Sequence, residues 1–341
     1  MMLSHSLRAA RRAGVRHVST QAVVYERLGN PTNVLKESDV EIGGESLRSD
    51  EVLVQMIAAP VDRFDLSAVA GAVAGVPATG IAGNQGVGVV NAVGSAVTAL
   101  SKGDRVVPIV PGVGTWSKFA VAHASSVAAV PKGINDEQAA LLGNGATALR
   151  VLGDAGLKNG DTVIHDGAAG PAGLAFVQVA KAKGLKTISI VDENAVDYKN
   201  VSKALKAAGS QAVIHESMAS SDSFRKVCAD LKPKLAVHSS SSKGSSAELA
   251  RALGDGGVLV SVSGAGPVVV PSSVLIEKGV TVRGFNLAKE LASTSGETIK
   301  ELEKLIKDGK LTQPAATKVP LSNFDDAIKQ AATGASVLFT M

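Results

Sequence analysis

The stretch that decides the fold is TVIHDGAAGPAGLAFVQVAKAKGLKTISIVD, residues 162–192. It opens on a short apolar run of β-branched side chains, which is typical of a buried parallel strand. Three glycines follow at three-residue spacing, Gly167, Gly170 and Gly173, and the residues after them have one apolar helical face. A second apolar run ends at Asp192. The order of strand, glycine-rich turn, helix and strand predicts a βαβ unit of a parallel sheet.

This glycine-rich turn predicts a dinucleotide site. Glycines let the backbone approach a pyrophosphate, and amide N–H groups at the helix N-terminus then hold the phosphates. Asp192 stands where an acid accepts from the ribose 2′-hydroxyl of NAD, and it would repel the 2′-phosphate of NADP. NAD(H) is therefore the nicotinamide cofactor that the charge favours. The alternative is a βαβ turn without a ligand, in which Gly167, Gly170 and Gly173 only permit close packing.

One residue of the turn weakens the prediction of a nucleotide. Pro171 has no backbone N–H, so it removes a donor where the phosphates would lie. Proline at the first position of a helix is structurally comfortable, so the fold itself is unaffected. We therefore predict either no nucleotide or weakly bound NAD(P)H at this turn and at Asp192.

Composition excludes several classes of protein. Among the 341 residues 45% are hydrophobic, but no apolar run is long enough to span a membrane. Only 3% are aromatic, so no platform for stacking single-stranded nucleic acid is indicated. Taking the four arginines of residues 1–20 from the 35 basic residues leaves 31, equal to the 31 acidic residues. The net charge of +4 therefore indicates no nucleic-acid-binding face.

The basic excess lies in MMLSHSLRAARRAGVRHVST, residues 1–20. This segment is rich in arginine, carries serines, lacks acids and can place its arginines along one side of a helix, which is typical of a mitochondrial transit peptide. The alternative is a disordered basic tail. We predict a mitochondrial protein of the matrix side.

Metal-binding patterns are missing from the sequence. Cys228 is the single cysteine, and the six histidines are scattered without a pair at ligand spacing. We therefore expect no zinc and no other metal site.

Strand and helix patterns divide the remaining chain. Residues 21–140 carry short strands with glycine turns, which favours a rolled antiparallel barrel. Residues 141–285 alternate strands with helices, which favours a doubly wound parallel sheet and the α/β fold class. Residues 286–341 carry a long amphipathic helix, predicted over 295–307, and then a second helix and a final strand.

Five segments together resemble one known family. They are AAPVDRFDL at 58–66 (similar to A-P-I-N-x-x-D), GNQGVGVV at 83–90 (G-N-E-G), GVGTWSKFAV at 112–121 (G-x-G-T-W), LLGNGATALRVL at 141–152 (N-P-x-T-A) and VRGFNL at 282–287 (R-G-F-W-L). The chain resembles the medium-chain dehydrogenase/reductase superfamily, and within it the mitochondrial 2-enoyl thioester reductases. The resemblance implies a GroES-like β-barrel domain of residues 21–140 and 286–341, and a doubly wound parallel Rossmann domain of residues 141–285.

The departures from this family's pattern fall on its active site. The family uses the tyrosine of a G-N-Y-G segment as proton donor, and the equivalent GAVAG at residues 71–75 has Val73 or a neighbour in its place. Reduction of an enoyl thioester delivers hydride to Cβ and a proton to Cα, and a positioned donor contributes roughly 10²–10⁴-fold. Asp62, Asp65, Thr147 and ordered water are alternative donors, and a carboxyl group among them would need a pKa raised by burial.

Other departures concern the cofactor and the pocket. An acid replaces the family's cofactor arginine, the S-G-V-G turn is GPAG here, and Gln85 stands where glutamate is usual. The resemblance implies a vestigial pocket of Asp62, Trp116, Asn144 and Thr147, with no catalytic residue retained. Trp116 fits a wall of that pocket and fits the barrel core equally well.

These departures leave two functions open. In the first, the chain is a degenerate, non-catalytic homologue of the reductases and serves as an accessory or structural subunit of a mitochondrial complex. In the second, it is an active NAD(P)H-dependent oxidoreductase that reduces enoyl thioesters or quinones by hydride transfer without the usual tyrosine. Quinone reduction needs less acid from the protein, so it tolerates the missing tyrosine.

The expected partners are other mitochondrial proteins or a second copy of the chain. Residues 268–270 and 280–285 are apolar strands near the far edge of the Rossmann sheet, where an uncovered edge would favour aggregation. The resemblance implies dimerisation through that edge.

Overall fold

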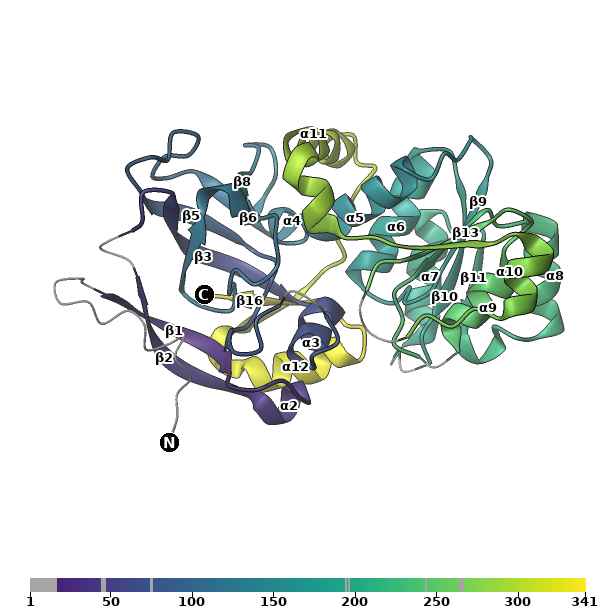
Figure 1. The fold of residues 1–341 in the computed structure, drawn as a ribbon, viewed down its shortest axis with the longest axis horizontal. Helices are drawn as coiled ribbons and strands as arrows, with labels where there is room; N and C mark the ends of the chain where they lie inside the picture. The colour runs from purple at the N-terminus through teal and green to yellow at the C-terminus, as the bar shows by residue number, and fades with distance from the viewer. Residues whose placement is uncertain are drawn as a thin grey trace.

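The computed structural model describes residues 17–43, 47–73, 76–193, 195, 197–242, 244–263 and 267–341. Figure 1 shows a barrel domain and a parallel-sheet domain side by side, with the long helix α11 (Leu287–Lys307) between them. The segment predicted to be a transit peptide, residues 1–20, lies outside the described residues except for 17–20, which open strand β1. The α/β architecture of a GroES-like barrel with a Rossmann domain is confirmed.

Two mainly antiparallel sheets form the barrel domain. The smaller has the order β2-β1-β4 and consists of β1 (His17–Tyr25), β2 (Leu35–Gly43) and β4 (Gly80–Ile81). The larger has the order β15-β16-β3-β5-β6-β8, with β7 paired to β3. Its strands are β3 (Glu51–Val61), β5 (Val87–Val93), β6 (Arg105–Pro108), β7 (Phe119–His123), β8 (Val127–Ala129), β15 (Thr317–Pro320) and β16 (Val337–Thr340).

Short helices complete the barrel domain, and residues of α3 and α4 line the cleft that faces the second domain. They are α2 (Pro31–Val34), α3 (Arg63–Val69), η1 (Ala124–Ser126), α4 (Asp136–Ala140), η3 (Leu321–Asn323) and α12 (Phe324–Ala332). α3 begins immediately after β3 because Asp62 caps it: its side chain accepts from the N–H groups of Phe64 and Asp65, and the Asp65 side chain accepts from the N–H of Asp62. This reciprocal capping fixes the start of α3.

The second domain is a six-stranded parallel sheet with the order β11-β10-β9-β12-β13-β14. The strands are β9 (Thr162–His165), β10 (Lys186–Val191), β11 (Ala212–His215), β12 (Leu235–His238), β13 (Val258–Ser261) and β14 (Thr281–Gly284). The order in which the chain adds strands reverses between β9 and β12: β10 and β11 lie on one side of β9, and β12, β13 and β14 lie on the other. In doubly wound sheets ligands bind outside the carboxyl ends of the strands at such a switch point.

Helices cover both faces of this sheet. They are α5 (Leu142–Gly153), α6 (Pro171–Ala182), α7 (Tyr198–Ala208), η2 (Glu216–Met218), α8 (Asp222–Leu231), α9 (Ser245–Ala252) and α10 (Ser272–Lys278). Successive strand residues face opposite sides. Val163 packs with α5 and α6, whereas the next residue, Ile164, packs with α8, α9 and α10. A strand buried on both faces has to be apolar throughout, and β9 is buried along its whole length.

One predicted helix starts earlier than expected. The helix predicted over 295–307 is α11, and it begins at Leu287. The Asn286 side chain accepts from the N–H of Lys289, so it caps the helix and adds two turns before residue 295. The prediction placed the start too late because the apolar periodicity is weak in this first part of the helix.

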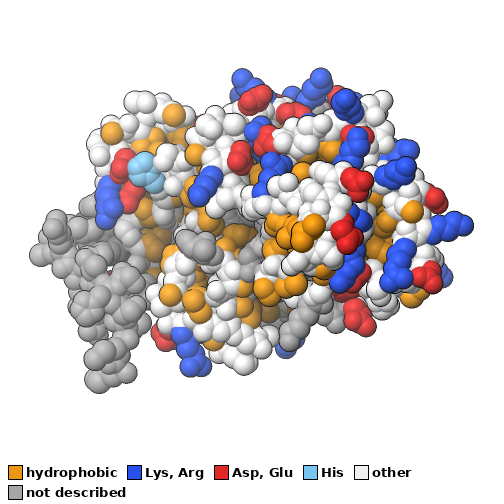
Figure 2. Space-filling view, turned by 45° about the vertical axis from the view of Figure 1, so that its right-hand side comes forward, with side chains coloured by type: hydrophobic (Ala, Val, Ile, Leu, Met, Phe, Trp, Pro, Cys, Tyr) orange, Lys and Arg blue, Asp and Glu red, His pale blue; other side chains and the backbone are white. Residues whose placement is uncertain are grey.

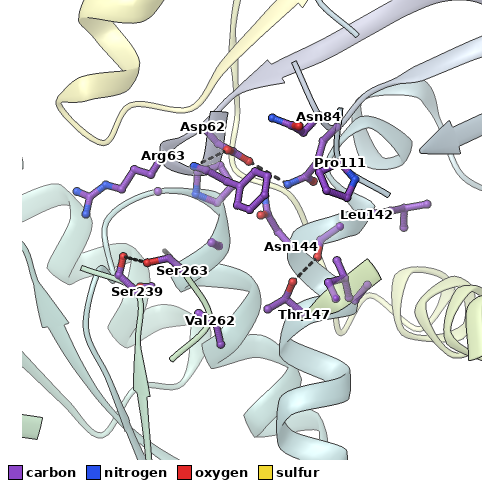
Figure 3. A pocket seen from close by; sticks show the side chains of 18 of the residues that line it. Asp62, Arg63, Asn84, Pro111, Leu142, Asn144, Thr147, Ser239, Val262 and Ser263 are labelled. Atoms are coloured by element: carbon purple, nitrogen blue, oxygen red, sulfur yellow. Dashed lines mark hydrogen bonds between the residues drawn. The ribbon is translucent and has the colours of Figure 1, made fainter. Parts of the chain in front are cut away.

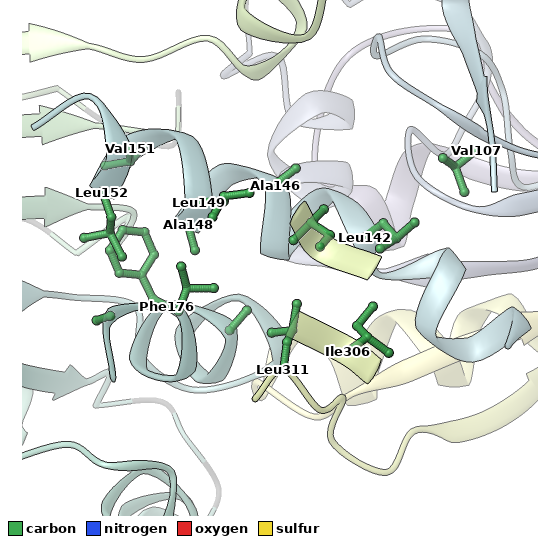
Figure 4. Packing of buried hydrophobic residues seen from close by; sticks show 14 of the residues in the cluster. Val107, Leu142, Ala146, Ala148, Leu149, Val151, Leu152, Phe176, Ile306 and Leu311 are labelled. Carbon is green, nitrogen blue, oxygen red and sulfur yellow. The ribbon is translucent and has the colours of Figure 1, made fainter. Parts of the chain in front are cut away.

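A buried cluster joins the two domains (Figure 4). Leu142 and Leu149 of α5 pack with Phe176 of α6 and with Ile306 near the end of α11. Val107 of the barrel strand β6 belongs to the same cluster. Side chains from both domains share this core, so it fixes the position of α5 between the barrel and the parallel sheet.

The barrel has a second core, and Trp116 lies in it. Its ring is fully buried and meets Phe339 of β16 edge to face at 5.2 Å between ring centroids. Its indole N–H donates to the carbonyl oxygen of Pro60 at 3.0 Å. The assignment of Trp116 to the pocket is therefore wrong, because its ring faces Phe339 and its one polar atom is already bonded inside the barrel.

Acidic and basic side chains are interspersed over the face shown in Figure 2. None of the helices in the described residues is long and apolar enough to span a membrane.

Candidate functional site

A cleft of about 510 Å³ lies between the barrel and the parallel sheet, at the switch point of the sheet. Three groups of residues line it, as Figure 3 shows in part. The barrel contributes Asp62, Arg63, Phe64, Val73, Asn84 and Gln85; α5 contributes Leu142, Gly143, Asn144 and Thr147; and the sheet domain contributes Asp166, Gly167, Gly170, Pro171, Gly173, Ser239, Val262, Ser263 and Phe285.

The glycine-rich turn forms one wall of this cleft. Gly167 has a φ of +61° and Gly170 a φ of +94°, values that side-chain-bearing residues rarely adopt. A Cβ on Gly173 would lie 2.2 Å from the carbonyl oxygen of Ala168, so only glycine lets α6 start this close to the turn. Gly167, Gly170 and Gly173 thus lie together in the cleft.

Pro171 is the first residue of α6, and Gly170 before it provides no side-chain cap. The N-terminus of this twelve-residue helix therefore borders the cleft with its next amides uncapped by any side chain. The missing N–H of Pro171 is a group that would have no partner within the helix anyway. The turn keeps the shape of a phosphate site with one donor fewer.

Asp192 follows β10 and is only 4% exposed. Its Oδ1 accepts from Nη1 of Arg63 at 2.8 Å and from Oγ of Ser240 at 3.2 Å. Its Oδ2 is buried without a hydrogen-bond partner. Asp192 is absent from the cleft lining, whereas Arg63 belongs to it, so the ion pair connects Asp192 to the edge of the cleft.

Arg63 was not predicted from the sequence. The family pattern has its cofactor arginine after the second strand of the sheet, whereas the cation beside Asp192 comes from the first turn of α3 in the barrel. The two residues are 129 positions apart, and no local spacing rule connects them.

A buried polar network connects the carboxyl ends of β9 and β12 at the switch point. Asp166 accepts from Nδ1 of His238 at 2.5 Å, from the N–H groups of Ser239 and Ser240 at 2.6 and 3.0 Å, and from Oγ of Ser245 at 2.8 Å. Burial alone would raise the pKa of Asp166, but these bonds, His238 first, hold that pKa below its usual value. Burial alone would lower the pKa of His238, and the hydrogen bond and charge of Asp166 raise it.

This network was also not predicted, because its sequence pattern is no more than a polar residue directly after each of two strands. Ser239, which lines the cleft, is fixed by it, because its N–H and its Oγ both bond to Asp166. The network therefore sets the shape of the sheet side of the cleft.

Carboxyl and amide groups form the opposite wall. Asp62 Oδ1 accepts from the N–H groups of Phe64 and Asp65 at 2.9 and 3.2 Å, and its Oδ2 accepts from Nε2 of Gln85 at 3.0 Å. Asp65 is buried behind it, and its Oδ1 accepts from the N–H and Nδ2 of Asn84 at 3.0 and 2.8 Å. Burial raises the pKa of Asp62, against hydrogen bonds from Asp65 and Phe64 that lower it. Burial and the charge of Asp62 raise the pKa of Asp65 well above its usual value.

Two polar atoms of this wall have no partner among the described residues. They are Nδ2 of Asn144, a side chain that is 8% exposed, and Oε1 of Gln85. Thr147, one turn along α5, donates from Oγ1 to the carbonyl oxygen of Gly143 at 2.9 Å. Both residues line the cleft, and a buried donor and a buried acceptor without partners favour a polar ligand beside them.

The structure brings most of the predicted site residues together. Asp62, Asn144 and Thr147 line one cleft with the three glycines, and Val73 lies in the same lining, at the place predicted for the missing tyrosine. Among the described residues, no group of three His, Cys, Asp or Glu side chains is placed to hold a metal ion.

Comparisons with known proteins agree with this architecture. Residues 48–132 match the family described as the alcohol dehydrogenase GroES-like domain, and residues 171–308 match the family described as zinc-binding dehydrogenase. The human mitochondrial enoyl-[acyl-carrier-protein] reductase is 36% identical over 319 residues, which cover 91% of this chain and 84% of the relative.

Solved structures show the same fold. The Etr1p complex with NADP and crotonyl-CoA, a protein of Candida tropicalis, superposes with a TM-score of 0.81 at 25% identity and covers 95% of this chain and all of that one. The NADPH complex of Escherichia coli quinone oxidoreductase has a TM-score of 0.81 at 24% identity, over 94% of this chain and 100% of that one, which shows likeness of fold. The chain belongs to the medium-chain dehydrogenase/reductase superfamily, in the family of the mitochondrial enoyl-[acyl-carrier-protein] reductases.

Proposed function

We propose that this chain is an NADH-dependent reductase of enoyl thioesters in the mitochondrial matrix. The observation that carries the proposal is the open cleft, with the glycine-rich turn on one side and Asp62, Asn144 and Thr147 on the other. A cleft of this volume with apolar walls and a few polar groups is typical of a small-molecule site. The location is supported by the acid-free, arginine-rich residues 1–20 and by the mitochondrial relatives.

The residues present fit a nicotinamide nucleotide. The unpartnered Oδ2 of Asp192 is a buried acceptor that a ribose hydroxyl would satisfy, and the N-terminus of α6, which has no side-chain cap, borders the cleft where phosphates would lie. Arg63 is engaged with Asp192, so its charge is not free for a 2′-phosphate, and NADH is favoured over NADPH. Such a nucleotide would supply a hydride when bound.

The rest of the cleft suits an acyl thioester. Val73, Leu142, Val262 and Phe285 give it apolar walls that can hold an acyl chain. Asn144 Nδ2 is the free donor that a thioester carbonyl oxygen would accept from. This donor would stabilise negative charge on that oxygen during the reaction.

The test uses the full chain with NADH, NADPH and crotonyl-CoA. We expect calorimetry to detect NADH more strongly than NADPH, and NADH absorbance to fall when crotonyl-CoA is added. Asp192→Asn should weaken NADH binding roughly 10-fold or more, since hydrogen bonds to a charged group contribute about 1.5–3 kcal/mol. Asp230→Asn, at an exposed position of α8, is the matched control and should bind NADH like the unaltered chain. Repeating the assay with a quinone in place of crotonyl-CoA shows which of the two substrate classes makes NADH absorbance fall.

The accessory-subunit function remains the second candidate, and two observations favour it. Val73, which with its neighbours corresponds to the family's tyrosine segment in the resemblance, lines the cleft without a hydroxyl group, and Pro171 removes one donor from the turn. Absence of any response to millimolar NADH or NADPH would contradict the reductase proposal and support this one.

We also propose that the partner at the sheet edge is a second copy of the chain. β14 is the outer strand of the parallel sheet, and all four of its residues are exposed. Val282 on β14 and Ile276 on α10 are 42% and 81% exposed, and Val269 is 52% exposed, although residues 268–270 do not form the strand expected there. An apolar strand edge of this kind is what a second strand or copy covers.

A further inference from the structure

Two residues in the cleft have exchanged their chemical types relative to the family pattern. Where that pattern has asparagine in A-P-I-N-x-x-D and glutamate in G-N-E-G, this chain has Asp62 and Gln85. The two side chains touch, because Nε2 of Gln85 donates to Oδ2 of Asp62 at 3.0 Å. In this chain the amide of Gln85 and the carboxyl group of Asp62 are hydrogen-bonded, and the carboxyl group lies at the start of α3.

The two oxygens of Asp62 have different surroundings. Oδ1 is held by the backbone N–H groups of Phe64 and Asp65, as a capping oxygen should be. Oδ2 faces Gln85, whose Oε1 is buried and unpartnered. A half-turn of the Gln85 amide would present Oε1 to Asp62, so Oδ2 can accept when ionised and donate when protonated. Either protonation state of Asp62 therefore has a partner.

Burial favours a proton on this pair of carboxyl groups. Burial raises the pKa of Asp62, and burial and the charge of Asp62 raise the pKa of Asp65, on the same helix, well above its usual value. The pair therefore shares a proton. The neighbouring cation, Arg63, pairs with Asp192 instead, and across the cleft Asp166 pairs with His238.

The polar side chains that line the cleft with Asp62 on the barrel and on α5 are neutral: Asn84, Gln85, Asn144 and Thr147. Of the two carboxyl groups only Asp62 lines the cleft, whereas Asp65 is turned to Asn84 and to the N–H of Asp62. Figure 3 shows Asp62, Asn144 and Thr147 among the side chains that line the cleft.

We propose that Asp62 is the proton donor of this reductase, acting from Oδ2 in place of the family's tyrosine; the inference rests on the function proposed above. The reduced nicotinamide is oxidised as it gives a hydride to Cβ of the enoyl thioester. Cα takes the proton from Asp62 Oδ2, so the carbon–carbon double bond becomes a single bond. The Asp62 carboxylate then recovers a proton from water, and Gln85 turns its amide to follow the change.

The central variant is Asp62→Asn in the full chain. Asparagine caps a helix as well as aspartate and can still pair with Gln85, so the fold and the thermal unfolding midpoint should change little. We expect the NADH dissociation constant to stay within about threefold of the unaltered chain. We expect kcat with crotonyl-CoA to fall roughly 10²–10⁴-fold, and the alkaline limb of the kcat–pH profile to disappear.

Asp192→Asn serves as the matched control, because it also turns an aspartate of this region into its amide. It should weaken NADH binding and leave the alkaline limb in place. An active unaltered chain with an Asp62→Asn variant of similar kcat and pH profile would overturn the donor role. An unaltered chain that consumes no NADH with any thioester would overturn the proposed function and the donor role with it.

A measurement without turnover provides the second readout. In protein labelled with ¹³C at aspartate carboxyl groups, the resonance that Asp62→Asn removes should titrate above the ordinary range of aspartate. A carboxyl group that titrates within or below the ordinary range would overturn the proposal, because it would hold no proton to donate near neutral pH.

Discussion

Arg63, in the first turn of α3, and Asp192, directly after β10, form an ion pair of 2.8 Å that joins the barrel to the parallel sheet. Asp192 is almost fully buried, and Arg63 is one-third exposed at the edge of the cleft. The pair therefore connects the position of the barrel to the acidic group that we propose as the ribose acceptor. Any nucleotide that reaches Asp192 has to share it with Arg63.

Removing the arginine should cost stability as well as nucleotide affinity. Arg63→Met leaves a buried carboxylate without its cation. We expect the free energy of unfolding to fall by about 1–2 kcal/mol, which is a small loss for a buried charge because water already screens the partly exposed Arg63. Urea titration measures this loss. Arg225→Met is the matched control: its pair with Asp222 is exposed, and its loss should stay within about 0.5 kcal/mol. Equal losses in the two variants would show that the interdomain pair has no special role.

His165 predicts a dependence of stability on pH. Burial lowers its pKa to about 4, against the charges of Asp166 and Asp192, which raise it. Between that value and the unfolded value of 6.5 the unfolded chain binds a proton that the folded chain does not, so stability rises with pH through this window. His165→Gln keeps a partner for Ser189 and should reduce the loss of unfolding free energy between these pH values by on the order of 2 kcal/mol. Parallel stability curves for both proteins would contradict the buried neutral histidine.

Val73 offers a way to return the missing hydroxyl to the cleft. In the Asp62→Asn background, Val73→Tyr should recover at least about tenfold of the lost kcat, because a positioned phenol can donate the proton. Val73→Phe fills nearly the same space without a hydroxyl and should recover nothing. Steady-state assays with NADH and crotonyl-CoA measure both variants. Equal effects of tyrosine and phenylalanine would mean that Val73 acts by volume alone.

The exposed edge of the parallel sheet predicts self-association. Placing charge on it with Ile276→Lys and Val282→Lys should weaken dimerisation by at least roughly tenfold, because a lysine cannot be desolvated in an apolar interface without a partner. Sedimentation velocity over a range of concentrations measures this. Met218→Lys, at an exposed residue beyond β11 at the opposite edge, should leave the dimer unchanged. A chain that is monomeric before any substitution would contradict this partner.

Local patterns were enough to predict the parallel sheet. The alternation of strands and helices predicted for residues 141–285 is present, and β9, β10 and β11 are each a short apolar run that is ended by turn residues. The start of α11 was missed because one capping side chain, Asn286, extends it beyond its apolar repeat. Strand periodicity is read over neighbours in sequence, and so it succeeds where neighbours in sequence decide the structure.

The site was predictable only in part. Asp62, Asn144 and Thr147 meet the glycine-rich turn as the family pattern implied, but the bonds of Asp192 to Arg63 and of Asp166 to His238 span 129 and 72 residues. Such pairs depend on how two domains are placed, which no spacing along the chain encodes. The position of Trp116 could not be decided for a similar reason: its partner in the barrel core, Phe339, is far from it in the sequence.

The last strand of the chain also limits the order in which the protein can form. β16 pairs with β3, so Val337 lies beside Val61 and the large barrel sheet needs residues from both ends of the sequence. During synthesis, the parallel sheet between them is complete while β16 is still inside the ribosome. The parallel sheet can therefore fold first, and β3 has no β16 to pair with until residues 337–340 have been made.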